Sequence, residues 1–309
     1  MPILVASFTA PPVRTSPTVI AEQLTLTLRR GSTSFALDES NGIKVLAGAQ
    51  GLDAPTLVAQ GRTPAGWDGE VIDSIAAEPR EVFLPLRFAG STLTDMTAKK
   101  RALLSFLNPR LGAVTLEAAF PNGSRRWIDG FYLRGLDGSW DVGNFHNTRQ
   151  LAGIVLRCPN PFWREPVQFT ASWAVQNDTE SPLPILPLAP GSSDVLGTPN
   201  KVALPGDVET YGVWKITGPL TSVTVVDSGA GRSFTFTQTL IAGETWTIDT
   251  RRGVQGVFSP SGSRQRATLN RGAQFWPLRP GQSVVTTQVT GASVGAKVAV
   301  SADVLWLTA

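Results

Sequence analysis

The sequence predicts a mostly β protein. Its 309 residues include 30 glycines and 23 prolines, which is typical of short strands joined by tight turns. Apolar and polar residues alternate in many short runs, as they do in strands that bury one face. Only one segment has the spacing of an amphipathic helix. We therefore expect an N-terminal β-sandwich with one helix and an extended arm, and then a second, C-terminal β-sandwich.

Length and composition limit the alternatives. The length favours about two domains, and an apolar content of 42% is enough for sizeable cores. The apolar runs are far too short to cross a bilayer. The first residues, MPILVASFTAPPVRTSP, lack a charged n-region, so we expect no signal peptide. The single cysteine cannot form an internal disulfide, which fits assembly in a reducing cytoplasm.

The charge pattern argues against a specific nucleic-acid binder. The formal net charge is only +3, from 27 basic and 24 acidic residues. The arginines are scattered along the chain, whereas a nucleic-acid interface normally gathers them into a stripe. We therefore do not predict nucleic acid as a ligand.

Residues 1–165 form the first predicted domain. Its clearest strand is EVFLPLRF, in which every second residue from Val82 to Phe88 is apolar. Pro85 has no N–H to donate, so we expect this strand at a sheet edge. The same alternation predicts strands in EQLTLTLRRG, AVTLEAAF, RWIDGFYLRGL and RQLAGIVLRC.

The predicted helix is TDMTAKKRALLSFLNP. Thr94 is a candidate N-cap, and Asn108-Pro109 ends the helix because proline disfavours the helical conformation of the preceding residue. A single stripe of apolar residues, expected to lie on a sheet, comprises Met96, Leu103, Leu104 and Leu107.

Between Asn41 and Arg80 the pattern weakens. The stretch AGAQGLDAPTLVAQGRTPAGWDGEVIDS is rich in Gly, Pro, Asp and Ala. A segment this long with little regular structure is usually functional or an extended arm. We interpret it as an arm.

Residues 166–205 are predicted to be a linker, because prolines crowd the stretch ESPLPILPLAPGSSDVLGTPNKVALPG and favour a semi-rigid spacer. Residues 206–309 then form the second predicted domain. Their spacing is that of a two-sheet sandwich or jelly roll. The alternating runs are VWKITG, SVTVVD, SFTFTQTL, ETWTIDT, QGVFS, QRATLN, SVVTTQVT and KVAVSADVLWLT.

The residues that usually carry chemistry are scarce. The only histidine, His146, lies beside asparagines in a turn, which favours a solvated or hydrogen-bonding residue over a general base. Cys158 lies on the apolar face of a strand without a local cation, so we interpret it as a buried small hydrophobe. The 24 carboxylates show no spacing of a catalytic pair. We therefore predict no catalytic, cofactor-binding or metal-ligating residues, and no enzyme.

Four tryptophans of the C-terminal region have two interpretations. Exposed on a β-sandwich they could stack on sugars, whereas buried they fill the core. Trp246 shares a strand face with Ile248, and Trp276 lies on the side of Leu278, so both are expected in the core. The four residues are Trp214, Trp246, Trp276 and Trp306.

The stretch LRCPNPFWREP marks the end of a folded unit, because Pro159 and Pro161 end strand pairing. A strand with such an ending, after the helix and turn AKKRALLSFLNPRLG, resembles the siphovirus distal tail protein family. GDVETYGVWKITGPLTSVTVVDSGAGRSFTFTQTLIAGETWTIDTRRG and FWPLRPGQSVV resemble the C-terminal domain of that family. The resemblance runs from about Leu24 to Val300, and departs from the family at Leu220-Thr221.

The resemblance implies a structural virion protein at the tip of a long, non-contractile phage tail. Such proteins form a hexameric ring (belt) between the tail tube and the tail-tip hub or baseplate, with a galectin-like or carbohydrate-binding-module-like sandwich projecting outward. The implied partners are further copies of the chain, the tube and hub proteins, the tape measure protein and receptor-binding proteins. DNA is implied only in transit.

Two other functions remain open from the sequence. A carbohydrate-binding module would attach a phage to a host-surface glycan, and a cell-wall enzyme would degrade it. Neither accounts for the segment between Asn41 and Arg80, which the ring uses as an arm to a neighbour.

Overall fold

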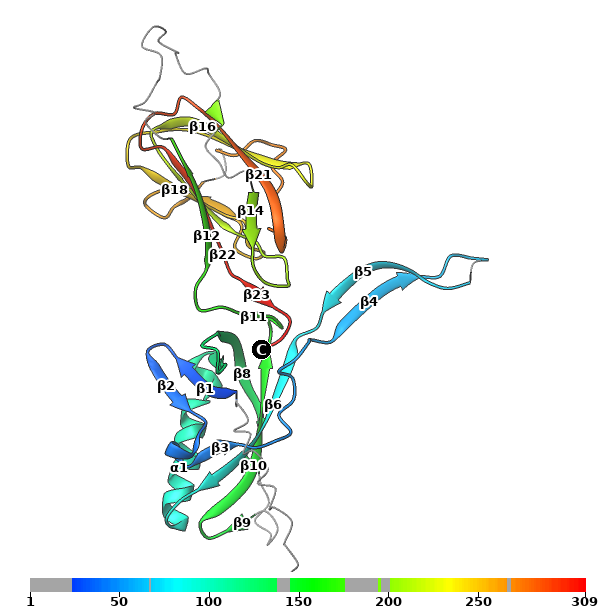
Figure 1. The fold of residues 1–309 in the computed structure, drawn as a ribbon, viewed down its shortest axis with the longest axis vertical. Coiled ribbons are helices and arrows are strands. Elements are labelled where there is room, and N and C mark those ends of the chain that lie inside the picture. The colour runs from blue at the N-terminus through cyan, green and yellow to red at the C-terminus, as the bar shows by residue number, and fades with distance from the viewer. Residues whose placement is uncertain (1–23, 67, 138–144, 176–193, 196–200, 266–267) are drawn as a thin grey trace, which may run out of the picture.

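The computed structural model describes residues 24–66, 68–137, 145–175, 194–195, 201–265 and 268–309. Two β-rich units are stacked along the long axis, and a hairpin projects sideways from the N-terminal unit (Figure 1). The prediction of a mostly β fold with an arm and one described helix is confirmed. Each unit has its own core of buried apolar side chains.

The N-terminal unit is built on one antiparallel sheet with the strand order β2-β1-β7-β8-β10-β6-β3. Alternation of apolar residues places one face of this sheet in the core, as predicted. Short strands β9 and β11 pair with β10 and β8, and two 3-10 helices, η1 (Glu39–Asn41) and η2 (Pro109–Leu111), join the strands. The strands are β1 Thr25–Arg30, β2 Thr33–Ala36, β3 Ile43–Val45, β6 Arg80–Ala89, β7 Val114–Ala119, β8 Arg125–Gly135, β9 Phe145–His146, β10 Arg149–Cys158 and β11 Trp163–Arg164.

The expected edge position of Pro85 is wrong. Strand β6 lies inside the sheet, between the full length of β10 and the short strand β3. The Pro85 carbonyl accepts a hydrogen bond from Leu46 N at 2.8 Å, just beyond the end of β3. Since the nitrogen and oxygen of one strand residue face the same neighbour, the missing N–H points to the side where regular pairing has already ended.

Helix α1 spans Leu93–Phe106 and contacts β6 and β10. Its N-cap is Thr92, not the predicted Thr94: Thr92 is extended, and its side-chain oxygen accepts from Asp95 N at 3.1 Å. Leu104 is 38% exposed and therefore lies outside the predicted apolar stripe. The side chains that the helix buries against the sheet are Met96, Leu103 and, just after its end, Leu107.

The arm is a two-stranded antiparallel hairpin of β4 (Leu57–Arg62) and β5 (Val71–Ala77). It extends away from both units and has no other strand beside it among the described residues (Figure 1). The sequence indicates the arm correctly. It does not indicate the regular strand pairing, because residues exposed on both faces of a hairpin show no alternation.

The C-terminal unit is a sandwich of two antiparallel sheets around a shared core. One sheet has the order β12-β22-β15-β18-β19-β20, and the other has β13-β21-β16-β17 with β14 also paired to β21. The strands are β12 Phe169–Ala174, β13 Asp194–Val195, β14 Lys201–Leu204, β15 Val213–Thr217, β16 Leu220–Asp227, β17 Arg232–Leu240, β18 Thr245–Asp249, β19 Gly256–Phe258, β20 Arg264–Gln265, β21 Gly281–Thr290 and β22 Lys297–Ala302.

Three of these strands, β12, β13 and β14, fall in the range 166–205 that the sequence predicts as a linker. Trp173 of β12 and Leu204 of β14 are buried in the C-terminal core. Both ends of the range therefore belong to the sandwich, because their apolar residues complete its sheets. Residues 176–193 and 196–200 lie outside the described residues.

The two units meet where the chain returns to its N-terminal half. Strand β23 (Leu305–Trp306) pairs with β11, and the C-terminal residue lies at this junction (Figure 1). The Arg126 guanidinium lies 4.2 Å from the centre of the Trp306 ring and donates to the carbonyl oxygens of Thr308 and Ala309, both at 2.8 Å. These contacts hold the last residues of the sequence against β8.

Candidate assembly surfaces

The arm exposes apolar side chains that a soluble hairpin normally buries. Leu57, Ile72 and Ile75 are 57%, 54% and 63% exposed, because no sheet of the described residues pairs with or covers the β4–β5 hairpin. A lone two-stranded hairpin is marginally stable in water, and its outer edges are free to pair. The arm therefore has the properties of a segment that is completed by another protein surface.

A groove of about 620 Å³ lies between the start of the first strand and the outer side of β3. Leu24 and Leu26 line one wall, and Val45, Leu46 and Leu52 line the other. Among the described strands β3 pairs only with β6, so its second edge is open toward this groove. The N-terminal unit thus offers both a projecting apolar arm and an open, partly apolar groove.

His146 and Cys158, the two residues considered for catalysis, lie outside both the arm and the groove. His146 is exposed and lies in β9, in register with Arg149 of β10. Cys158 is fully buried, and burial raises the pKa of its thiol to about 12 although the Arg80 charge acts in the opposite direction. Strand pairing places His146 opposite Arg149 and Cys158 opposite Arg80, so these two residues do not form a nucleophile–base pair.

Three of the four tryptophans considered above lie in the core of the C-terminal unit. Trp214, Trp246 and Trp276 are 2%, 8% and 4% exposed, and Trp276 lies 5.4 Å from Phe234 and 6.4 Å from Trp214 between ring centres. They cannot stack on a sugar from solution. Trp306 packs instead at the junction, where its ring N–H donates to Glu165 at 3.0 Å.

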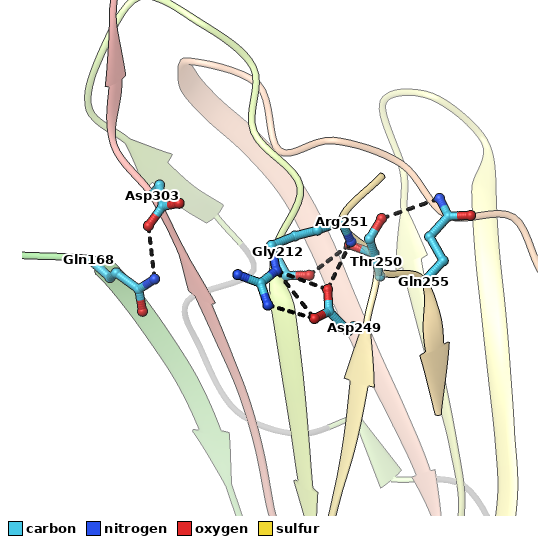
Figure 2. Close-up of polar contacts among 7 residues, drawn as sticks. All are labelled: Gln168, Gly212, Asp249, Thr250, Arg251, Gln255 and Asp303. Atoms are coloured by element: carbon cyan, nitrogen blue, oxygen red, sulfur yellow. Dashed lines mark hydrogen bonds and ion pairs between the residues drawn. The ribbon is translucent and has the colours of Figure 1, made fainter. Parts of the chain in front are cut away.

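A polar cluster at the end of β18 was not indicated by the sequence (Figure 2). Asp249 accepts from the backbone N–H and the guanidinium of Arg251 at distances of 2.7–3.2 Å. Burial opposes ionisation of Asp249, but these bonds outweigh it and hold the pKa of this carboxyl below its usual value. The hydrogen bond to Asp249 raises the pKa of Arg251, and the charge of Asp303 adds to it.

The remaining contacts of the cluster join neighbouring segments. The Thr250 hydroxyl donates to Gly212 O at 2.7 Å, Gln255 donates to Thr250 O at 3.3 Å, and Gln168 donates to Asp303 at 2.8 Å (Figure 2). Each polar group is used to fix a strand end, so we interpret the cluster as structural. A sequence gives no signal for it, since its members lie in four separate segments.

The described residues contain no group of three or more His, Cys, Asp or Glu side chains that could hold a metal ion. No helix among them is long and apolar enough to cross a membrane.

Fold and surfaces together define a class of protein: a two-unit β protein with an apolar arm, an open groove and polar clusters that serve its own folding. No protein-family model matches the sequence, and no curated protein matches it. Among solved structures, the chain is similar to the Dit protein of phage SPP1, described as a paradigm of the hub adsorption apparatus in phages that infect Gram-positive bacteria.

The similarity to SPP1 Dit has a TM-score of 0.62 at 16% identity and covers 91% of this chain and 99% of that chain. The phage P2 baseplate in its activated conformation also matches, with a TM-score of 0.48 at 11% identity over 91% of this chain and 98% of that chain. The predicted resemblance to distal tail proteins is thus confirmed at the level of the fold.

Proposed function

We propose that the chain is a structural protein of a long, non-contractile phage tail. In this proposal it forms a ring, with six copies expected, that joins the tail tube to the tail-tip hub or baseplate. The observation that carries the proposal is a fold shared with SPP1 Dit over nearly the full length of both chains. The exposed apolar arm supports it, because a closed ring needs two different complementary surfaces on each subunit.

The proposed division of labour follows the two units. The N-terminal unit, residues 1–165 as predicted, builds the ring, and the arm of one subunit docks on the next. The C-terminal sandwich projects from it. The partners proposed are further copies of the chain, the tube protein, the hub protein, the tape measure protein and receptor-binding proteins, at the tail tip of a virion assembled in the host cytoplasm. DNA passes through without specific contacts.

The proposal includes no enzymatic activity. Asp249 is held in an ion pair with Arg251, and Cys158 is buried away from solvent. Turnover of host peptidoglycan by pure protein, abolished by a single carboxylate variant, would contradict this part of the proposal.

The ring is tested on the purified full chain by light scattering and negative-stain electron microscopy. We expect a particle of six times the 32.9 kDa chain mass, with rings in the images. A monomer at all concentrations, with no ring formed on addition of the tube protein, would contradict the proposal.

A further inference from the structure

A second pocket, of about 240 Å³, lies at the end of the C-terminal sandwich from which the chain leaves for β23. Four separate segments converge on it: the loop before β15, the β16–β17 hairpin, the turn after β18 and the loop before β21. Trp276, whose side chain is buried in the core, is also among the residues that line the pocket. The polar residues that line the pocket are Glu209, Tyr211, Asp227, Arg232, Arg252 and Arg279.

Three guanidinium groups therefore face one small space, and they differ in what they already bind. Arg252 lies over the Tyr211 ring, 5.4 Å from its centre, and donates to the Tyr211 hydroxyl at 3.4 Å. Among the described residues, neither the Arg232 nor the Arg279 side chain has a hydrogen bond or ion pair. Two cations without a partner at one pocket are an arrangement that an anion would complete.

The carboxylates of the pocket limit what that anion can be. Asp227 is buried and accepts from Gly229 N and Ala230 N at 3.0 and 3.4 Å, which ties it to its own turn. Glu209 is exposed beside it. These two negative charges repel a strongly acidic segment, but they can accept hydrogen bonds from hydroxyl groups. The pocket thus suits a ligand that combines one oxyanion with several hydroxyls.

We propose that this pocket binds an acidic saccharide or polyol, with Arg232 and Arg279 holding its carboxylate or phosphate and Glu209 and Asp227 accepting from its hydroxyls. The fork of a guanidinium matches the two oxygens of a carboxylate or phosphate, which makes arginine the expected residue for this task. The inference goes beyond the ring and does not depend on it, since every residue involved belongs to one C-terminal sandwich.

The test is calorimetric titration of the full chain at low salt with glucuronate, with glycerol 3-phosphate and with glucose. We expect at least one of the two anions to bind and glucose to bind at least about tenfold more weakly. Arg232→Gln and Arg279→Gln should each weaken binding by about tenfold or more, because each removes a charge-assisted hydrogen bond. Added salt should weaken it further.

The matched control is Arg271→Gln, at an exposed arginine of the same unit that does not line the pocket. It should leave affinity within about twofold of the wild type. Arg279→Lys keeps the charge but loses the fork, so it should bind more weakly than wild type even though the fold is undisturbed.

Which anion binds identifies the natural source as a uronic acid or a phosphate-bearing polymer, and either outcome supports the proposal. Three results overturn it: equal binding of glucose, equal loss in Arg271→Gln, or no binding of either anion. A peptide with the acidic arm sequence GEVIDS that binds in place of both anions would make the pocket a contact between copies of the chain, which also overturns it.

Discussion

Cys158 carries a nucleophilic group in surroundings that suppress its reactivity. It is fully buried at the end of β10, and a Cβ atom added at Gly130 would lie only 2.9 Å from its sulfur. Burial raises the pKa of the thiol to about 12, which more than cancels the opposing effect of Arg80. At neutral pH the reactive thiolate is therefore absent in the folded state.

We expect native protein to resist a thiol reagent at pH 8 for hours, whereas unfolded protein reacts completely within minutes. The reason is that labelling needs both solvent access and a thiolate, and folding removes both. The measurement is a time course with a chromogenic disulfide reagent, with and without denaturant. Rapid labelling of the native protein would show that the end of β10 opens readily.

Asp249 gives a prediction with a defined pH dependence. Replacement by Asn should lower the free energy of unfolding at pH 7 by about 1–2 kcal/mol, because the Arg251 side chain loses its ionised partner. The pKa of Asp249 is lower in the folded state, so the stabilisation is present above the unfolded-state pKa of about 3.9 and is lost as pH falls through the lower folded value.

Urea melts of wild type and Asp249→Asn at pH 7 and at about pH 3 measure this difference. The gap in stability should narrow at the acidic pH. The exposed arm residue Asp68 is the control, and Asp68→Asn should leave the midpoint unchanged at pH 7. If the difference in unfolding free energy between wild type and Asp249→Asn stays constant with pH, then Asp249 stabilises the fold through the shape of its side chain and not through its charge.

At the scale of elements, we expect the exposed side chains of the arm to be needed for the ring but not for the stability of the subunit. Ile72 and Ile75 are more than half exposed, so changing both to Asp should leave the fold intact, with a change in unfolding free energy below about 0.5 kcal/mol. It should abolish the ring, because two charges would be buried against the neighbour. Light scattering gives the mass, and Ile241→Asp, 72% exposed in the C-terminal unit, is the matched control.

The residues to delete in order to remove the arm can be chosen only from the structure. A deletion from Gly48 to Gly69 would leave β5 without its partner and remove Leu52, whose carbonyl accepts from Trp163 and Ala309 at 3.1 and 2.8 Å. Replacement of residues 58–76 by a short turn spares these contacts. Rings that persist in this variant would show that the arm is not the contact between subunits.

Trp276 tests the core of the sandwich. Trp276→Ala should cost about 3–5 kcal/mol, since the ring is buried against Trp214 and Phe234. The fragment to melt in denaturant is 167–309 and not 206–309, because β12 and β14 supply core residues. A loss below about 1 kcal/mol would contradict the interpretation as a core residue.

At the scale of the whole molecule, the contacts at the junction hold the two units together. Arg126 stacks on Trp306 and donates to two carbonyl groups of the last residues, so Arg126→Ala should free β23 from β8. We expect faster proteolysis near residues 164–168 and a larger radius of gyration in X-ray scattering, while each unit keeps its own core. Arg125→Ala, the neighbouring and more exposed arginine, should change neither property.

Local pattern predicted well wherever one face of an element is buried by its own unit. The alternation in β6 and β10 and the position of Trp276 in the core were indicated because burial leaves a periodic trace in the sequence. The sequence did not indicate that Pro85 lies inside the sheet, because this depends on the backbone groups of a segment distant in sequence. It also did not indicate Thr92 as the N-cap, because this depends on which hydroxyl the backbone N–H of Asp95 meets. The arginines of the second pocket lie in separate loops and leave no local pattern at all.

The sequence by itself determined the fold class, the one described helix, the arm and the burial of Cys158 and Trp276, because each follows from periodicity or composition within a few residues. Only the tertiary structure decided that the range 166–205 contributes β12 and β14 to the sandwich, that β23 returns to the N-terminal unit, and that Arg232 and Arg279 share a pocket. The physical reason is that strand pairing joins residues far apart in the chain, and its hydrogen bonds are formed by backbone groups that every sequence has in common.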